Sequence, residues 1–385
     1  MTQIRASQPF LPASSVRVVG SLLAALAVIT LTACGSTKPK PAPLESLRPS
    51  ATVQTVWSQR LGRIDGPMSL SVRNGVVTTA STDGDILALD LNSGRERWRA
   101  RTKDDLTAAV GSDGRYAAVV TTENELQAFD QGKLLWTERL PGRVTTAPLV
   151  AGERVFIQSV DRSVRAYDVV DGRWLWQYQR PGGDPLALSS SGVLTSFRDT
   201  LVVGQGARLV GLDPVQGSVR FDVNVGTPRG SNEVERLADL IGPVARSDNQ
   251  VCARAFQLSV ACVDLDRGRV RWSRPQAGSR PVGADAALVV GADSADRLTA
   301  WKADNGDSLW RVDRFTYRGL SAPAVLGRFV AVVDGEGYLH VLSADDGRTL
   351  ARVELDSAAA AAPVVSDQLL LVVTRKGTLY ALRVN

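Results

Sequence analysis

Histidine and cysteine are scarce in this sequence, and their scarcity limits the chemistry that it can support. The 385 residues include one histidine, His340, and three cysteines, Cys34, Cys252 and Cys262. Zinc sites draw on clusters of cysteine and histidine, and a Ser-His-Asp triad needs a histidine beside the nucleophile. We therefore expect no catalytic residues, no metal site and no cofactor, with His340 as a packed or surface residue of a strand.

A strong charge imbalance and a membrane-spanning apolar run are also missing. Lys and Arg number 45 against 40 Asp and Glu, and no stretch interleaves basic with aromatic residues, which argues against nucleic-acid binding. One apolar run, residues 18–32, has 15 residues, whereas a helix needs about 20 to cross a bilayer. Because Arg5 and Arg17 are the only charges before it, this run is typical of a signal peptide.

What the sequence does contain is one short pattern that recurs. Residues 83–98 predict a strand over 86–90, a tight turn from Asp90 to Gly94 and a returning strand with Trp98. In such a turn the Asp side chain accepts backbone N–H bonds, and Gly supplies the positive φ. The large ring is predicted to wedge between neighbouring sheets. Its position is filled in later copies by Trp136, Trp176, Phe221, Trp272, Trp310 and, in a decayed seventh copy, Ala351.

The copies recur roughly every 40 residues, which is the period of a β-propeller blade of four antiparallel strands. The eighth copy has three strands and ends at Asn385, whereas residues 53–59 form a strand with Trp57 that lacks three preceding strands. We therefore predict an all-β, eight-bladed β-propeller over residues 53–385, closed by the N-terminal strand joining the last blade. A sandwich or barrel of unrelated strands would not repeat one turn and one aromatic position.

Two segments break the period and are candidates for a binding face, since insertions in repeat proteins map to loops. One is residues 181–189, which place apolar residues in a Gly- and Pro-containing loop. The other is residues 227–241, whose composition predicts a helix with Asn232 as its cap and Glu233 near its start. The alternative is that both segments are only packing caps.

Cys252 and Cys262 flank a predicted hairpin whose turn lies near Gln257-Leu258. In an oxidising compartment a cross-strand disulfide is compatible with this spacing. A slip of one residue in the register would separate the two sulfur atoms, so the sequence leaves both states open. Our prediction favours two buried thiols over a disulfide.

The first part of the sequence resembles that of bacterial lipoproteins, because Leu31-Thr32-Ala33-Cys34 matches a lipobox. The resemblance implies that residues 1–33 are a signal peptide and that Cys34 is acylated. Residues 34–52 contain four prolines and are predicted to form an extended, solvated tether. Because Gly35 replaces the Asp of an inner-membrane retention signal, the resemblance implies the periplasmic face of the outer membrane, with two or more acyl chains for firm anchoring.

The repeat resembles the quinoprotein-type propeller, which the pyrroloquinoline-quinone dehydrogenases share with the BamB family of the outer-membrane β-barrel assembly machinery. With the lipobox, the closing strand and the stretch 230–239, the chain is similar to the BamB family over nearly its whole length. The resemblance implies a non-enzymatic scaffold that docks on BamA, works with other subunits of the complex and assists folding and insertion of β-barrel proteins. Unfolded outer-membrane proteins are a further partner that it implies.

The docking face of that family contains Leu-x-Leu followed by Arg, and acidic residues after an Arg-Leu pair. Both motifs are present here with one departure each, because Ser189 replaces the Arg and Ile241 replaces one acidic residue. The resemblance carries a partner-binding role to Leu186, Leu188, Arg236, Leu237 and Asp239.

Two other functions are open to a propeller lipoprotein. The same loops could bind another envelope partner or peptidoglycan. A quinone-dependent dehydrogenase would hold its cofactor over the channel, typically with Ca²⁺, stacked on Trp and covered by adjacent cysteines. No two cysteines are adjacent in this sequence, and blade packing already accounts for the tryptophans.

Overall fold

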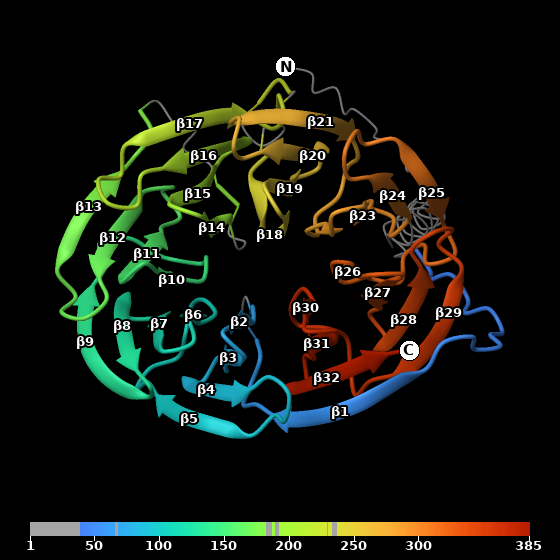
Figure 1. Cartoon of the computed structure of the whole chain (residues 1–385), viewed down its shortest axis with the longest axis horizontal. Helices are drawn as coiled ribbons and strands as arrows, with labels where there is room; N and C mark the ends of the chain where they lie inside the picture. Colours follow the sequence, from blue (N-terminus) through green and yellow to red (C-terminus); the bar gives the residue numbers. More distant parts are fainter. Residues whose placement is uncertain (1–38, 66–67, 182–186, 189–191, 229, 233–236) are drawn as a thin grey trace, which may run out of the picture. The chain divides into compact units, whose positions relative to one another are not determined.

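Eight four-stranded antiparallel sheets, one for each predicted blade, form a ring (Figure 1). The computed structural model describes residues 39–65, 68–181, 187–188, 192–228, 230–232 and 237–385. The chain divides into two compact units, residues 1–40 and 41–385, and all the sheets belong to the second. Within the described residues the regular structure is β, and no helix has the length and apolar character needed to cross a bilayer. The all-β propeller prediction is confirmed.

Each blade runs from an inner strand beside the ring centre to an outer strand on the wall (Figure 1). Blades 1 and 2 are β2 (Ser71–Arg73), β3 (Val76–Ala80), β4 (Asp85–Asp90), β5 (Glu96–Arg101), and β6 (Gly111–Ser112), β7 (Tyr116–Val120), β8 (Glu125–Asp130), β9 (Lys133–Arg139). Blades 3 and 4 are β10 (Leu149–Ala151), β11 (Arg154–Gln158), β12 (Val164–Asp168), β13 (Trp174–Tyr178), and β14 (Leu194–Phe197), β15 (Thr200–Gln205), β16 (Arg208–Leu212), β17 (Val219–Asn224).

The second half of the ring repeats this plan. Blades 5 and 6 are β18 (Leu240–Ser247), β19 (Gln250–Ala255), β20 (Ser259–Asp264), β21 (Arg269–Pro275), and β22 (Gly283–Ala284), β23 (Leu288–Ala292), β24 (Leu298–Lys302), β25 (Ser308–Val312). Blades 7 and 8 are β26 (Ala324–Leu326), β27 (Phe329–Val333), β28 (Tyr338–Ser343), β29 (Thr349–Glu354), and β30 (Val364–Ser366), β31 (Leu369–Val373), β32 (Thr378–Val384), β1 (Val53–Arg60).

The N-terminal strand closes the ring, as predicted. β1 pairs antiparallel with β32, from Val53 opposite Val384 to Arg60 opposite Thr378. Just before β1, Thr52 and Asn385 exchange two backbone N–H···O hydrogen bonds, each of 3.0 Å. Blade 8 therefore has four strands although they come from opposite ends of the sequence.

The recurrent aromatic side chain packs on the recurrent glycine of the next blade. Gly306, in the β24–β25 turn of blade 6, has a φ of 72°, and a Cβ atom built on it would lie 2.5 Å from the ring of Trp272. The Trp272 indole N–H also donates to the Ala303 carbonyl at 2.9 Å. The same contact joins Trp57 to Gly94, Trp136 to Gly172, Trp176 to Gly217 and Trp310 to Gly347.

Blade 7 has Ala351 at the aromatic position because blade 8 has no turn for a ring to cover. β32 and β1 are not consecutive in the chain, so the usual turn with its glycine is missing between them. Ala51 packs there instead, in one buried cluster with Val341 and Ala351. The N–H groups of Ser50 and Ala51 donate to the Leu350 carbonyl at 2.8 and 3.3 Å. The residues that precede β1 thus replace the missing ring.

The described end of the predicted tether is attached to the ring. Residues 42–52, which we call the strap, contact blade 7 and the link before it through backbone and side-chain hydrogen bonds. Most residues of the strap are exposed, but Ala51 is buried. The earlier part of the predicted tether, the signal peptide and Cys34 lie outside the described residues or in the first unit.

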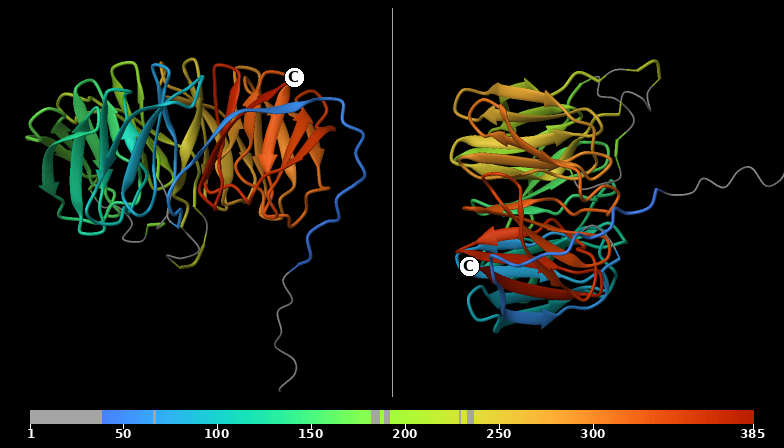
Figure 2. Two further views of the ribbon diagram at one scale, coloured as in Figure 1. Left: turned by 90° about the horizontal axis from the view of Figure 1, so that it is seen from below. Right: turned by 90° about the vertical axis from the view of Figure 1, so that its right-hand side faces the viewer.

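The two faces of the ring carry different loops. Antiparallel pairing places the turns between second and third strands, and the links between blades, on one face. We call it the insertion face because it carries the β13–β14 and β17–β18 links. The turns between first and second strands, and between third and fourth strands, lie on the opposite face, which we call the turn face. In Figure 2 the C-terminus lies at the turn face.

His340 is packed in blade 7, which agrees with one of the two environments predicted for it. The imidazole is buried, and its Nε2 donates to Asp334 Oδ2 at 2.9 Å. Arg318 donates to the same oxygen through Nε at 2.8 Å. Burial opposes ionisation of Asp334, but hydrogen bonds from His340, the Tyr338 N–H and Arg318 lower the pKa of this carboxyl to about 2. An ionised Asp334 therefore links β28 to the loop before β26.

Acid is expected to weaken the fold through Asp334. Its folded-state pKa of about 2 lies below the value of about 3.9 for an unfolded chain. This difference in pKa contributes roughly 2 kcal/mol to the free energy of unfolding. The contribution is present above about pH 4 and is lost as the pH falls towards 2. Asp334→Asn should flatten the pH dependence of the urea-unfolding free energy in this window. Asp304→Asn, which removes an exposed carboxylate, is the control, and equal slopes for the two variants would contradict the prediction.

The prediction of two buried thiols is wrong, because Cys252 and Cys262 form a disulfide. The two residues are directly paired between β19 and β20, and their Cα atoms are 4.1 Å apart. Both are buried at the interface between blades 5 and 6. The hairpin turn at residues 256–258 sets this register, which spacing alone left open.

Loss of the disulfide is expected to lower the free energy of unfolding by roughly 2–3 kcal/mol, because it closes a short loop in the unfolded chain. Cys252→Ala combined with Cys262→Ala tests this in urea. Alkylation of the denatured protein with and without reductant counts the free thiols. Two thiols that react without reductant would show that the bond is absent.

The predicted helix over residues 227–241 is also wrong where the structure describes it. Residues 227–228, 230–232 and 237–239 have no regular structure, and Leu240-Ile241 begin β18. Leu240 pairs with Ala255, and its N–H donates to the Gly206 carbonyl at 2.9 Å, which requires an extended chain. Glu233 and Arg236 lie outside the described residues, whereas Asn232 lies in a bend.

Candidate partner-binding site

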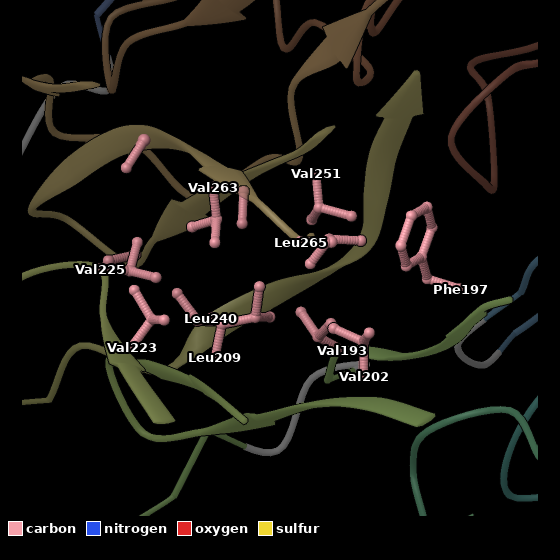
Figure 3. Packing of buried hydrophobic residues seen from close by; sticks show 13 residues of the cluster. Val193, Phe197, Val202, Leu209, Val223, Val225, Leu240, Val251, Val263 and Leu265 are labelled. Atoms are coloured by element: carbon pink, nitrogen blue, oxygen red, sulfur yellow. The ribbon is translucent and has the colours of Figure 1, made fainter. Parts of the chain in front are cut away.

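The links that contain the two predicted insertions are anchored in one hydrophobic cluster between blades 4 and 5. Val193, at the end of the β13–β14 link, is buried in this cluster. Val225 and Leu240, at the two ends of the β17–β18 link, are buried in it as well, and Figure 3 shows them around Leu209. These anchored ends hold the two links beside each other on the insertion face.

Asp239 connects the two links directly. Its Oδ1 accepts a hydrogen bond from Arg162 Nη2 at 2.7 Å, and its Oδ2 accepts the backbone N–H of Leu188 at 2.6 Å. The Asp239 carbonyl accepts the N–H of Phe256 at 3.0 Å. The Arg162 and Asp239 side chains are only 15% and 14% exposed, so this ion pair is partly shielded from water. Asp239 therefore joins blades 3 and 5 and orders the segment that carries Leu188.

A cleft of about 880 Å³ opens beside this ion pair. Its walls include Arg162, Arg180 and Arg208, and apolar side chains at Pro228 and Leu237. Arg208 is held by Asp222 at 2.6 Å, and Arg180 lies 3.4 Å from the same carboxylate. The arrangement offers apolar surface next to guanidinium groups, which is the composition of an interface core with a polar rim.

Two further features lie close to the cleft residues Arg180, Arg208 and Asp239. Burial, together with the nearby Asp222 carboxylate, raises the pKa of Tyr178, so the phenol is neutral at physiological pH. Leu188, Gln158 and Gly192 are among the residues that line a cavity of about 40 Å³. The Gly192 N–H donates to Thr146 Oγ1 at 2.8 Å, and a Cβ atom on Gly192 would lie 2.9 Å from Gln158 Oε1. Gly192 is thus packed tightly against the side chains of Thr146 and Gln158.

The structure brings together three of the residues to which the resemblance gave a binding role. Leu188 and Leu237 are half-buried on the insertion face, and Asp239 lies between them in the ion pair. Leu186, Arg236 and Cys34 lie outside the described residues, as does Ser189. Ile241 is buried in β18 and does not face the cleft.

Sequence reasoning missed Arg162, which lies in the β11–β12 turn and is separated from Asp239 by 77 positions. Nothing in the local pattern distinguishes it from the other arginines of the chain. Its φ of 63° shows that an ordinary residue here adopts the left-handed conformation that several other turns give to glycine. Only the neighbouring placement of blades 3 and 5 around the two links pairs these charges.

Asp239→Asn should lower the free energy of unfolding by about 1–3 kcal/mol, because it removes a shielded carboxylate that accepts two hydrogen bonds. It should also expose the Leu188 segment to proteolysis. Asp199→Asn breaks an ion pair with Arg220 in which the carboxylate is 78% exposed, and should leave stability unchanged. Urea unfolding of both variants checks this. Equal destabilisation would show that the shielded ion pair contributes no more to the free energy of unfolding than the exposed one.

Comparison with known proteins agrees with this architecture. The family model described as "Outer membrane protein assembly factor BamB" matches residues 82–312 and 303–385. The chain belongs to the BamB family. A relative from Burkholderia pseudomallei (strain K96243), named outer membrane protein assembly factor BamB, is 34% identical over 95% of this chain and 98% of its own length.

Solved structures share the fold. BamB from Moraxella catarrhalis superimposes with a TM-score of 0.77 at 22% identity, over 86% of this chain and all of that one. The quinohemoprotein alcohol dehydrogenase from Comamonas testosteroni gives a TM-score of 0.63 at 15% identity, over 86% of this chain and 76% of that one. The second likeness concerns the propeller alone. Within the described residues, no group of three or more His, Cys, Asp and Glu side chains is placed to hold a metal ion.

Proposed function

We propose that this chain is a non-enzymatic scaffold of outer-membrane protein assembly, lipid-anchored through Cys34 at the periplasmic face of the outer membrane. Its insertion face docks on BamA and so assists the folding and insertion of β-barrel proteins. The observation that supports the proposal is that Leu237 and Asp239 line one cleft and that Asp239 binds the backbone N–H of Leu188, in a member of the BamB family. Other subunits of the complex bind through BamA or beside it.

The chemistry of the cleft supports a protein partner. Part of each half-buried leucine side chain stays in contact with water until a partner covers it. Apolar side chains buried at the centre of an interface supply most of its affinity. The guanidinium groups of Arg162, Arg180 and Arg208 surround this centre. A partner segment with apolar side chains flanked by carboxylates complements this surface.

The experiment is an affinity purification of the full-length, lipidated protein from detergent-solubilised envelopes. We expect BamA to be recovered together with other barrel-assembly subunits. Cys34→Ser should abolish incorporation of a labelled fatty acid into the protein, which should still bind BamA in detergent. Absence of BamA from a purification of folded, membrane-associated protein would contradict the proposal, and recovery of peptidoglycan or a different envelope protein would point to the alternative.

A further inference from the structure

The closing strand creates a topological problem for a protein anchored at its N-terminus. β1 is the fourth strand of blade 8 and begins opposite Val384, where β32 ends. That end of β32 lies at the turn face, because third strands run from the insertion face to the turn face. A tether attached directly to Thr52 would therefore leave the ring on the side opposite the Asp239 cleft.

The strap returns the chain across the thickness of the ring. Followed backwards from Thr52 to Ala42, the strap starts beside Asn385 at the turn face and runs along blade 7. It then reaches the β25–β26 link, which is part of the insertion face (Figure 2). The Ala42 N–H donates to the Thr316 carbonyl at 2.9 Å, and Arg318 Nη1 donates to the Ala42 carbonyl at 2.8 Å. The described chain of the second unit therefore leaves the ring on the insertion face.

The middle of the strap is held by charged and polar contacts. Glu45 Oε1 accepts a hydrogen bond from Thr349 Oγ1 at 3.2 Å and lies 3.4 Å from Arg314 Nε. The Glu45 carbonyl accepts Arg352 Nη1 at 3.0 Å. These contacts, with those of Ser50 and Ala51 to Leu350, follow the outer side of β29 and the link before blade 7.

The end of the strap rests on a rigid support. Arg318, which holds the Ala42 carbonyl, is buried and pairs with Asp334 through Nη2 at 2.7 Å and with Glu336. Asp334 is fixed in turn by His340. A guanidinium held in this way does not reorient to follow a moving chain, so the exit point at Ala42 is set by the core of blade 7.

We propose that the strap turns the insertion face towards the lipid surface that holds the chain. This rests on the proposed acylation of Cys34. The eight residues from Cys34 to Ala42 extend to at most about 30 Å, whereas a chain free as far as Thr52 would extend to about 60 Å and emerge from the turn face. Short reach and a fixed exit together favour one orientation, in which the Asp239 cleft faces partners suspended beneath the membrane.

The test uses full-length, lipidated protein in liposomes that contain energy-transfer acceptor lipids. One donor fluorophore is placed at Lys376→Cys, in the β31–β32 turn on the insertion face, or at Asp345→Cys, in the β28–β29 turn on the turn face. Both positions are exposed and lie in neighbouring blades next to the strap. Because the faces are separated by roughly 20 Å, the length of a six-residue strand, we expect about twofold stronger transfer from position 376.

A loosened strap supplies the control. Ala42→Pro removes the N–H bond to Thr316, and Glu45→Ala removes the contacts with Thr349 and Arg314, while every ring residue stays as it is. In this variant the difference between positions 376 and 345 should largely disappear at unchanged thermal unfolding of the ring. Equal or reversed transfer with the intact strap would overturn the proposal, as would an undiminished difference with the loosened strap.

Failure of the proposed acylation is a separate result. In that case the protein would not float with the liposomes at all, and no transfer would be measured from either position. Coupling a maleimide lipid to the Cys34 thiol of the mature chain then allows the same comparison, with the donor attached at position 376 or 345 through a ketone-bearing residue in place of cysteine. Preferential transfer from position 376 under these conditions would support the orientation, and equal transfer would contradict it.

Discussion

Leu186→Asp combined with Leu188→Asp should abolish the recovery of BamA in affinity purifications while the propeller remains folded. Leu188 lies half-buried at the rim of the insertion face, and its backbone is already held by Asp239. An aspartate side chain there must lose water when a partner covers it. Two side chains that each contribute about 2 kcal/mol to an interface account together for roughly a thousandfold change in Kd.

The turn face offers a matched control for this substitution. Val170 and Val215 lie in equivalent turns of blades 3 and 4 and are 59% and 58% exposed. Val170→Asp combined with Val215→Asp adds the same two charges to the opposite face and should leave BamA recovery unchanged. Full recovery with the folded leucine variant, or an equal loss with the valine control, would remove the insertion face from the proposed interface.

Gly306→Ala should lower the free energy of unfolding by about 2–5 kcal/mol. Two costs add at this position. A non-glycine residue in the left-handed region costs about 1–2 kcal/mol, and the new Cβ would lie 2.5 Å from the Trp272 ring, where overpacking costs about 1–3 kcal/mol. Either the ring shifts out of the interface between blades 5 and 6, or the turn opens.

Gly75→Ala separates the two costs. Gly75 has a φ of 70°, close to the 72° of Gly306, but a Cβ atom built on it would meet nothing within 4 Å. It should therefore lose only the conformational part, about 1–2 kcal/mol. Urea unfolding of the two variants gives the contact with Trp272 by difference. A zero difference would show that the Trp–Gly contact between blades tolerates an added methyl group.

The repeat can be predicted from the sequence because the residues that specify each turn lie within a few positions of one another. An Asp four residues before a Gly specifies a tight turn through hydrogen bonds within that turn, as Asp90 does for the N–H of Ser93 at 3.0 Å. The recurring Trp and the strand fragments at the two ends then fix the blade count and the closure. The attachment of residues 42–52 to blade 7 has no such local signal, because its partners lie about 300 positions away in the sequence.

The two wrong predictions both depend on how strands pair. Cys252 and Cys262 form a disulfide only because the hairpin register places them opposite each other. Helical composition in residues 227–241 did not prevent Leu240 from pairing as a strand with Ala255. Tertiary hydrogen bonds outweigh helix propensity here, since propensity contributes at most about 0.7 kcal/mol per ordinary residue.

The turns, the strands, their period and the number of blades are determined by the sequence by itself, because backbone conformation and hydrophobic alternation depend on neighbouring residues. Only the tertiary structure shows that Trp57, Trp136, Trp176, Trp272 and Trp310 each pack on a turn glycine of the next blade, and that Asp239 contacts Arg162 and Leu188. It also decided that the strap leaves blade 7 at Ala42. These contacts join residues of different blades and links, so they depend on how the blades pack side by side and not on neighbouring residues in the sequence.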